Sequence, residues 1–68
     1  MNINPADYES KYEYHLEKIY NNKEVMKLFA EEATQLLFQA KFGQGEEPRE
    51  VTLRKMKQLA YVCYLTLP

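Results

Sequence analysis

The chain has 68 residues, with nine Lys and Arg, ten Asp and Glu, one His, one Cys and a formal net charge of −1. A chain of this length forms a single domain and buries only about 60% of the surface that its unfolded form exposes. A single Cys excludes an internal disulfide, and one Cys with one His cannot supply the four ligands of a structural zinc site. We therefore expect one domain, residues 1–68, that is stabilised by close helix packing or by a second copy of the chain.

The start of the chain and its hydropathy predict where the protein works. Residues 1–10, MNINPADYES, contain neither the positive charge nor the apolar run of a secretory signal. The longest uncharged stretch, residues 58–68, is about half as long as a membrane span requires. These features, with the single cysteine, predict a cytoplasmic protein that does not span a membrane.

The first predicted element is a helix over residues 5–20. Asn4 is a suitable N-cap, and Pro5 suits the first helical position because its missing N–H costs no hydrogen bond there. Four large side chains recur at helical spacing and share one arc: Tyr8, Tyr12, Leu16 and Ile19. Asn21 and Asn22 end this helix.

A second helix is predicted over residues 23–42, which contain neither Gly nor Pro. Asn22 precedes it as a cap, and Gly43 follows where a left-handed residue commonly ends a helix. The main apolar stripe consists of Val25, Phe29, Ala33, Leu36 and Ala40, widened by Met26, Ala30 and Leu37. A second apolar set lies on roughly the opposite face: Leu28, Phe38 and Phe42. We therefore expect this helix to be central, with a neighbour on each of its two faces.

Residues 43–50, GQGEEPRE, form the predicted connecting loop, and a third helix is expected over residues 51–66. Residues 59–67 are apolar almost all round, which is typical of a helix buried on every face, although their strand formers leave a strand as the alternative. The three helices predict an all-α, antiparallel three-helix arrangement. A helical hairpin that completes its core as a homodimer is the alternative.

No group of residues indicates catalysis, and we expect neither an enzyme nor a cofactor or metal. His15, the only imidazole, has no Asp or Glu three or four residues away, so we expect it at the helix boundary with one nitrogen in water. Cys63 lies late in an apolar helix, where burial makes a thiol inert. The loop 43–50 has two glycines but lacks the Lys-Ser/Thr of a phosphate-binding loop.

Charged residues are unevenly distributed. Residues 1–47 hold nine acidic and five basic side chains, whereas residues 48–68 hold one acidic and four basic. The basic residues near the start of the third helix are candidates for contact with nucleic-acid phosphates, or with the acidic first helix of a partner subunit: Arg49, Arg54, Lys55 and Lys57.

The chain contains six tyrosines and no tryptophan. Tyrosine combines a large apolar area with a polar tip, which suits half-buried positions and protein interfaces. Helical geometry places Tyr14 on the outer face of the first helix. The predicted partner-binding residues are Tyr14, Glu13, Glu17 and Tyr20, and the predicted dimer interface consists of Phe38, Phe42, Val62 and Leu65.

Residues 51–65, VTLRKMKQLAYVCYL, locally resemble the opening helix of antitoxin-type domains, which begins with a Thr-Leu-Lys-Leu-Gln-Lys-Leu-Leu-Tyr-like run. The resemblance covers less than a quarter of the chain and implies no residue roles.

The features together favour a non-enzymatic helical protein-binding regulator or inhibitor, of the kind that phages and plasmids encode. Its acidic, tyrosine-rich face is expected to block a basic groove on a larger macromolecule, and the chain is expected to form a homo-oligomer. The alternatives are a nucleic-acid-binding regulator that uses the basic residues of the third helix, and an accessory subunit of a larger complex.

Overall fold

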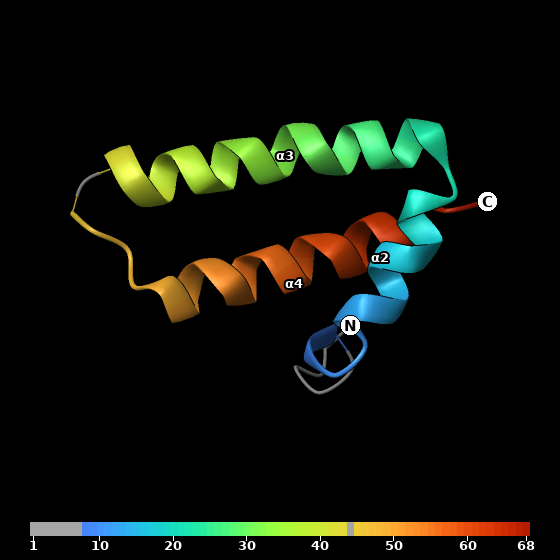
Figure 1. Ribbon diagram of the computed structural model, residues 1–68, viewed down its shortest axis with the longest axis horizontal. Coiled ribbons are helices and arrows are strands. Elements are labelled where there is room, and N and C mark those ends of the chain that lie inside the picture. Colours follow the sequence, from blue (N-terminus) through green and yellow to red (C-terminus); the bar gives the residue numbers. More distant parts are fainter. Residues whose placement is uncertain (1–7, 44) are drawn as a thin grey trace.

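The computed structural model describes residues 8–43 and 45–68, which contain three long helices and no strand. Helix α2 spans Tyr12–Tyr20, α3 spans Lys23–Phe42 and α4 spans Arg49–Leu65 (Figure 1). Each pair of these helices is in contact. The predicted all-α three-helix arrangement is therefore confirmed, and residues 59–65 are helical rather than extended.

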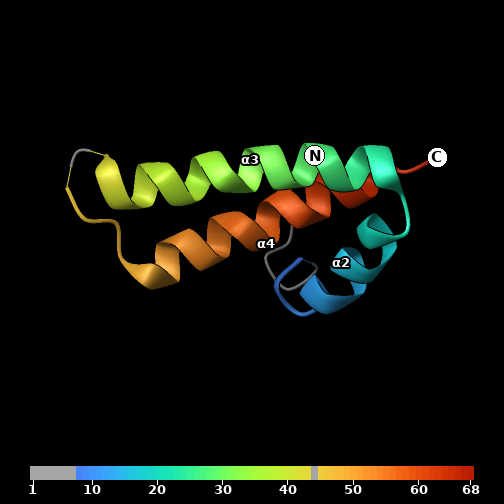
Figure 2. The same ribbon diagram turned by 45° about the horizontal axis from the view of Figure 1, so that its top comes forward.

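Helices α3 and α4 form a long antiparallel hairpin, and α2 packs against one side of it. Figures 1 and 2 show α2 at the end where α3 begins and α4 finishes, while the connection after α3 lies at the opposite end. Helix α2 has nine residues and α3 has 20, which correspond to lengths of about 13.5 Å and about 30 Å. Only one end of the hairpin therefore has α2 beside it.

The predicted first helix is interrupted. Tyr8 and Glu9 are helical, but Ser10 and Lys11 form a turn, and Lys11 adopts φ −110° and ψ 20° before α2 begins. Ser weakens a helix because its hydroxyl competes for backbone hydrogen bonds. Contacts with α4 hold the residues before the turn, since Tyr8 lies against Tyr61 with ring centroids 6.2 Å apart. The expected cap at Asn4 and Pro5 lies outside the described residues.

The prediction for the start of α3 is confirmed, whereas the prediction for its end is wrong. Asn22 caps the start as predicted, because its Oδ1 accepts a hydrogen bond from the Val25 N–H at 3.1 Å. The prediction that Gly43 adopts a left-handed conformation is wrong, since Gly43 is extended with φ −77° and ψ −173°. A Cβ at Gly43 would lie 2.5 Å from the Gln39 carbonyl oxygen, so close approach explains the glycine. The positive φ occurs at Gly45 instead, at 86°.

Helix α4 begins at Arg49, two residues earlier than predicted. Glu47 ties the connection to the first turns of α4, because it accepts a hydrogen bond from the Thr52 hydroxyl at 2.7 Å and forms an ion pair with Lys55. A hydrogen bond from Lys55, a further one from Thr52 and the nearby Lys55 charge lower the pKa of the Glu47 carboxyl. The connection is therefore fixed to α4 by side chains close in sequence.

The core lies where the three helices meet. Ile19 of α2, Phe29 of α3 and Ala60 and Cys63 of α4 are buried together. Partly buried side chains surround them: Tyr12, Leu16, Val25, Met26, Ala33, Met56, Leu59 and Tyr64. The main stripe predicted on α3 therefore faces the core through its N-terminal half.

The expectation that α3 has a neighbour on each of its two apolar faces is wrong. All three helices contact one another, and α2 docks on the side of the hairpin rather than on the second apolar face of α3 (Figure 2). The second apolar face of α3 consequently stays open, with Phe38 63% and Phe42 65% exposed. The C-terminal end of α4 is likewise not buried on every face, since Val62 and Leu65 are exposed.

Candidate protein-interaction surfaces

Three of the four predicted partner-binding residues gather around one shallow depression on α2. Its lining, here called the acidic hollow, consists of Glu13, Leu16, Glu17, Tyr20 and Asn21. Glu13 and Glu17 are one turn apart, on the face of α2 opposite the buried His15 and Ile19. Tyr20 is 75% exposed at the end of the helix. The hollow therefore presents two carboxylates and an aromatic ring away from the hairpin.

Tyr14, the fourth predicted residue, lies apart from the hollow and contacts α4. Its ring meets that of Tyr64 edge to face, with centroids 5.7 Å apart, and the Lys18 Nζ lies 5.4 Å from its centroid. A hydrogen bond with Tyr14 raises the pKa of the Tyr64 hydroxyl. Tyr14 is half exposed and joins α2 to α4, so the prediction of a purely outer position did not foresee this packing.

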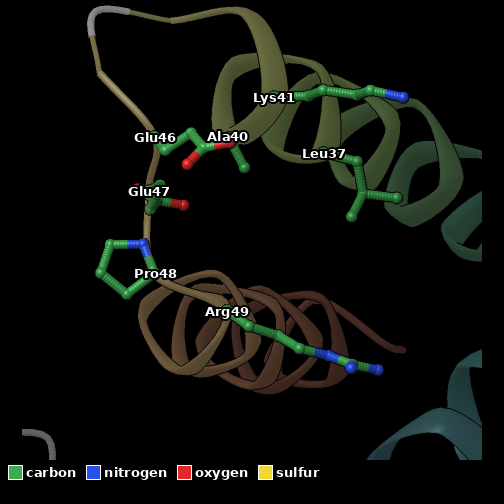
Figure 3. A pocket seen from close by; sticks show the side chains of 7 residues that line it. All are labelled: Leu37, Ala40, Lys41, Glu46, Glu47, Pro48 and Arg49. Atoms are coloured by element: carbon green, nitrogen blue, oxygen red, sulfur yellow. The ribbon is translucent and has the colours of Figure 1, made fainter.

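A second depression, here called the loop-end groove, lies between α3 and α4 beside their connection (Figure 3). Its lining consists of Leu37, Ala40, Lys41, Glu46, Glu47, Pro48 and Arg49. Leu37, Lys41 and Arg49 point toward the side of the hairpin on which α2 lies. Glu47 is paired with Lys55, so the rim charges without an ion-pair partner among the described residues are those of Lys41, Arg49 and Glu46. The Lys41 Nζ lies 5.7 Å from the centroid of the Phe42 ring.

Two of the four basic residues predicted as a nucleic-acid contact have acidic partners within the chain. Arg54 Nε lies 3.5 Å from Glu9 Oε1, and Lys55 pairs with Glu47. Arg49 borders the loop-end groove, whereas Lys57 is half-buried. Counting charges along the sequence could not reveal these partners, because Glu9 lies 45 positions away from Arg54.

The predicted dimer-interface residues lie in two places. Phe38 and Phe42 stack on the outer face of α3, with ring centroids 4.9 Å apart and planes tilted by 47°. Val62 and Leu65 belong to the C-terminal part of α4, at the opposite end of the antiparallel hairpin. The structure therefore does not combine these four residues into one surface.

His15 is buried rather than at the helix boundary, with 2% of its surface exposed. Its ring lies between tyrosines, at centroid distances of 4.6 Å from Tyr64 and 5.3 Å from Tyr61. Its Nδ1 is buried and has no hydrogen-bond partner among the residues that the structure describes. Burial, together with the positive charge of Lys11, lowers the pKa of the imidazole. The signal that sequence reasoning missed is Ile19, since a residue four positions before a core residue shares its helix face.

Cys63 is buried in the core, and burial raises the pKa of its thiol, with a smaller contribution from Glu32. Its burial and the direction of its pKa are as predicted, and the inertness of the thiol stays a prediction. Within residues 8–43 and 45–68, no group of three or more His, Cys, Asp and Glu side chains is placed to hold a metal ion. None of the helices in this part of the chain has the length and apolar character needed to cross a membrane.

The fold and its surfaces define a small three-helix protein with an acidic hollow and an open groove. Comparison with models of protein families finds no match, and searches among curated proteins and solved structures find no significantly similar protein. The local resemblance of residues 51–65 to antitoxin-type helices thus gains no support from relatives.

Proposed function

We propose that the protein is a non-enzymatic protein-binding module that regulates or inhibits a larger partner by placing its acidic hollow on a basic surface. The observation that carries this proposal is the clustering of Glu13, Glu17 and Tyr20 around one depression. No other segment within residues 8–43 and 45–68 covers this face of α2, which points away from the hairpin.

The chemistry of the hollow suits an arginine or lysine of a partner. Two carboxylates one turn apart accept charge-assisted hydrogen bonds from a guanidinium or ammonium group. The exposed ring of Tyr20 offers a face on which the same cation, or the alkyl part of its side chain, packs. Aromatic residues beside such ion pairs commonly carry much of the binding energy of an interface.

The test is affinity capture from an extract of the native host, followed by calorimetry with the purified partner. We expect the double variant Glu13→Lys with Glu17→Lys to weaken binding of that partner at least about tenfold, because like charges then face each other. The matched control is Glu24→Lys with Glu31→Lys, which reverses two exposed charges on α3 and is expected to bind normally. Equal binding by the original chain and the Glu13/Glu17 variant would exclude the hollow as the binding surface.

A further inference from the structure

We infer that a second copy of the chain is itself a partner for the acidic hollow, and that two copies form a two-fold dimer. In this dimer the hollow of each copy occupies the loop-end groove of the other. The inference rests on the proposed function, because it names a partner for the same surface. It adds the groove, which the proposed function does not use.

The loop-end groove lies on the same side of the hairpin as α2. Helix α2 covers one end of that side, and the groove is at the uncovered end. Helix α2 occupies the end where α4 finishes, and the groove occupies the end beside the connection, on the same side (Figures 1 and 3). Leu37 is 55% exposed in this groove, and Ala40 lines it. Leu53, two turns before the buried Ala60, lies on the core-facing side of α4 yet is 47% exposed. A short helix laid here would cover these apolar side chains as α2 covers those at the other end.

The charges of the two surfaces are complementary. The hollow carries the carboxylates of Glu13 and Glu17, whereas the groove rim carries two cations, Lys41 and Arg49, against the one unpaired carboxylate of Glu46. Glu47 adds little repulsion, because Lys55 and Thr52 already occupy its carboxylate. Leu16 and Tyr20 of the hollow provide apolar surface for the floor of the groove. Such complementarity fixes the orientation of partners and speeds their association.

The positions of the two surfaces suit a closed dimer. Hollow and groove lie on the same side of the hairpin but at opposite ends, so a two-fold axis between them brings each hollow onto the groove of the other copy. Each contact is then made twice, which is the rule for a two-fold interface. Each α2 lies between two hairpins, with His15 and Ile19 facing its own hairpin and Glu13 and Glu17 facing the other. No surface that this contact uses is left free to recruit a third copy.

The dimer and a larger partner compete for the same hollow. A target with a stronger basic groove therefore binds the separated chain, and at concentrations where the dimer prevails, target occupancy rises less steeply than the total concentration of the protein. The acidic hollow would thus be buried in the dimer and become exposed when the dimer dissociates.

The first experiment is sedimentation equilibrium of the full chain and two double variants. The groove variant is Lys41→Glu with Arg49→Glu, and the hollow variant is Glu13→Lys with Glu17→Lys. We expect the original chain to dimerise and each variant to dissociate at least about tenfold more readily, because like-charge contacts replace the ion pairs at both hollow–groove contacts of the dimer. Circular dichroism checks that each variant keeps its helices. The controls Glu24→Lys with Glu31→Lys and Lys23→Glu with Lys27→Glu change as many exposed charges and are expected to dimerise normally.

The second experiment mixes the two variants in equal amounts. The reversed hollow of one then faces the reversed groove of the other, while the unchanged hollow and groove meet as in the original dimer. We therefore expect a heterodimer to form at concentrations at which each variant alone is a monomer. This rescue cannot arise from misfolding, which mixing would not repair.

Three outcomes would overturn the inference. The original chain sediments as a monomer up to its solubility limit, both charge variants dimerise normally, or mixing fails to restore association. Loss of the dimer in Phe38→Ser, with the charge variants unaffected, would place the interface on the outer face of α3 instead. A monomer whose capture of a partner still depends on Glu13 and Glu17 would leave the proposed function standing while the dimer fails.

Discussion

His15 is the residue whose position departs most from expectation, and it makes stability depend on pH. It lies within a ring cluster to which α2 contributes Tyr14 and α4 contributes Tyr61 and Tyr64, and Lys11 is the cation that acts on it. Protonation would place a charge on a buried imidazole whose Nδ1 has no partner among the described residues. The neutral form is therefore the one that the fold accommodates.

The sign of the pH effect follows from the lowered pKa of His15. An unfolded chain binds this proton near the ordinary pKa of 6.5, whereas the folded chain binds it only at lower pH. We expect stability to be fully present above that value and to fall as the pH drops through 6.5 toward the folded pKa. Urea denaturation across this range measures the loss.

The control for His15 is His15→Phe, which keeps a ring in the cluster and removes the titration. Carboxylates contribute equally to both proteins, so the difference between their pH profiles isolates the imidazole. Because the chain has one His, a nuclear magnetic resonance titration reports its pKa directly. A folded pKa at or above 6.5, or parallel stability profiles, would contradict the expected effect.

At the scale of the helices, the start of α3 depends on one side chain. Asn22 accepts the hydrogen bond of the Val25 N–H, which has no partner within the helix. We expect Asn22→Ala to cost about 1 kcal/mol in the free energy of unfolding. Asn21→Ala is the matched control, because the exposed Asn21 side chain donates only to the Glu17 carbonyl. A cost no larger than that of the control would show that the cap contributes nothing.

The contact between Glu47 and α4 is tested by the pKa of the Glu47 carboxyl. Hydrogen bonds from Lys55, the larger contribution, and from Thr52 lower this pKa. We expect Lys55→Met to raise it toward the ordinary value of 4.5 and Thr52→Val to raise it less. Carboxyl titration by nuclear magnetic resonance provides the measurement, and Lys57→Met is the control. An unchanged pKa in Lys55→Met would mean that the pair does not persist in solution.

Local signals in the sequence predict two of the three helices well. The bounds of α3 are as expected, because Asn22 caps its start and its interior lacks Gly and Pro. The helix over residues 59–65 also prevails over the strand alternative, since α4 continues an amphipathic pattern that begins before it. The turn at Ser10 and Lys11 escapes such reasoning because contacts distant in sequence hold it, namely those of Tyr8 with Tyr61 and Glu9 with Arg54.

In the candidate site, as in the fold, the sequence predicts only those features that depend on spacing along one helix. Glu13, Glu17 and Tyr20 share a helix face, so their spacing places them together. Tyr14 and the four basic residues depend on how the helices pack, and spacing along one helix carries no such information. The loop-end groove is likewise invisible in the sequence, because its walls come from two helices that meet only in the fold.

For the molecule as a whole, the position of the core predicts which side chains matter for stability. Ile19 is fully buried, and we expect Ile19→Ala to cost about 2–5 kcal/mol in the free energy of unfolding. Phe38 is larger but 63% exposed, so Phe38→Ala is expected to change stability by only about 0.5 kcal/mol in the separated chain. Urea denaturation at a concentration below any self-association checks both. Equal costs would contradict the exposed position of Phe38 in the separated chain.

Because Cys63 is buried, the rate at which its thiol reacts with a reagent measures the opening of the core. The thiol is packed with Ile19 of α2, Phe29 of α3 and Ala60 of its own helix, α4. A thiol reagent therefore reaches Cys63 only during the moments when the helices separate. The labelling rate at a saturating or limiting reagent concentration would report how often the core opens and how much time it spends open, without any engineered probe.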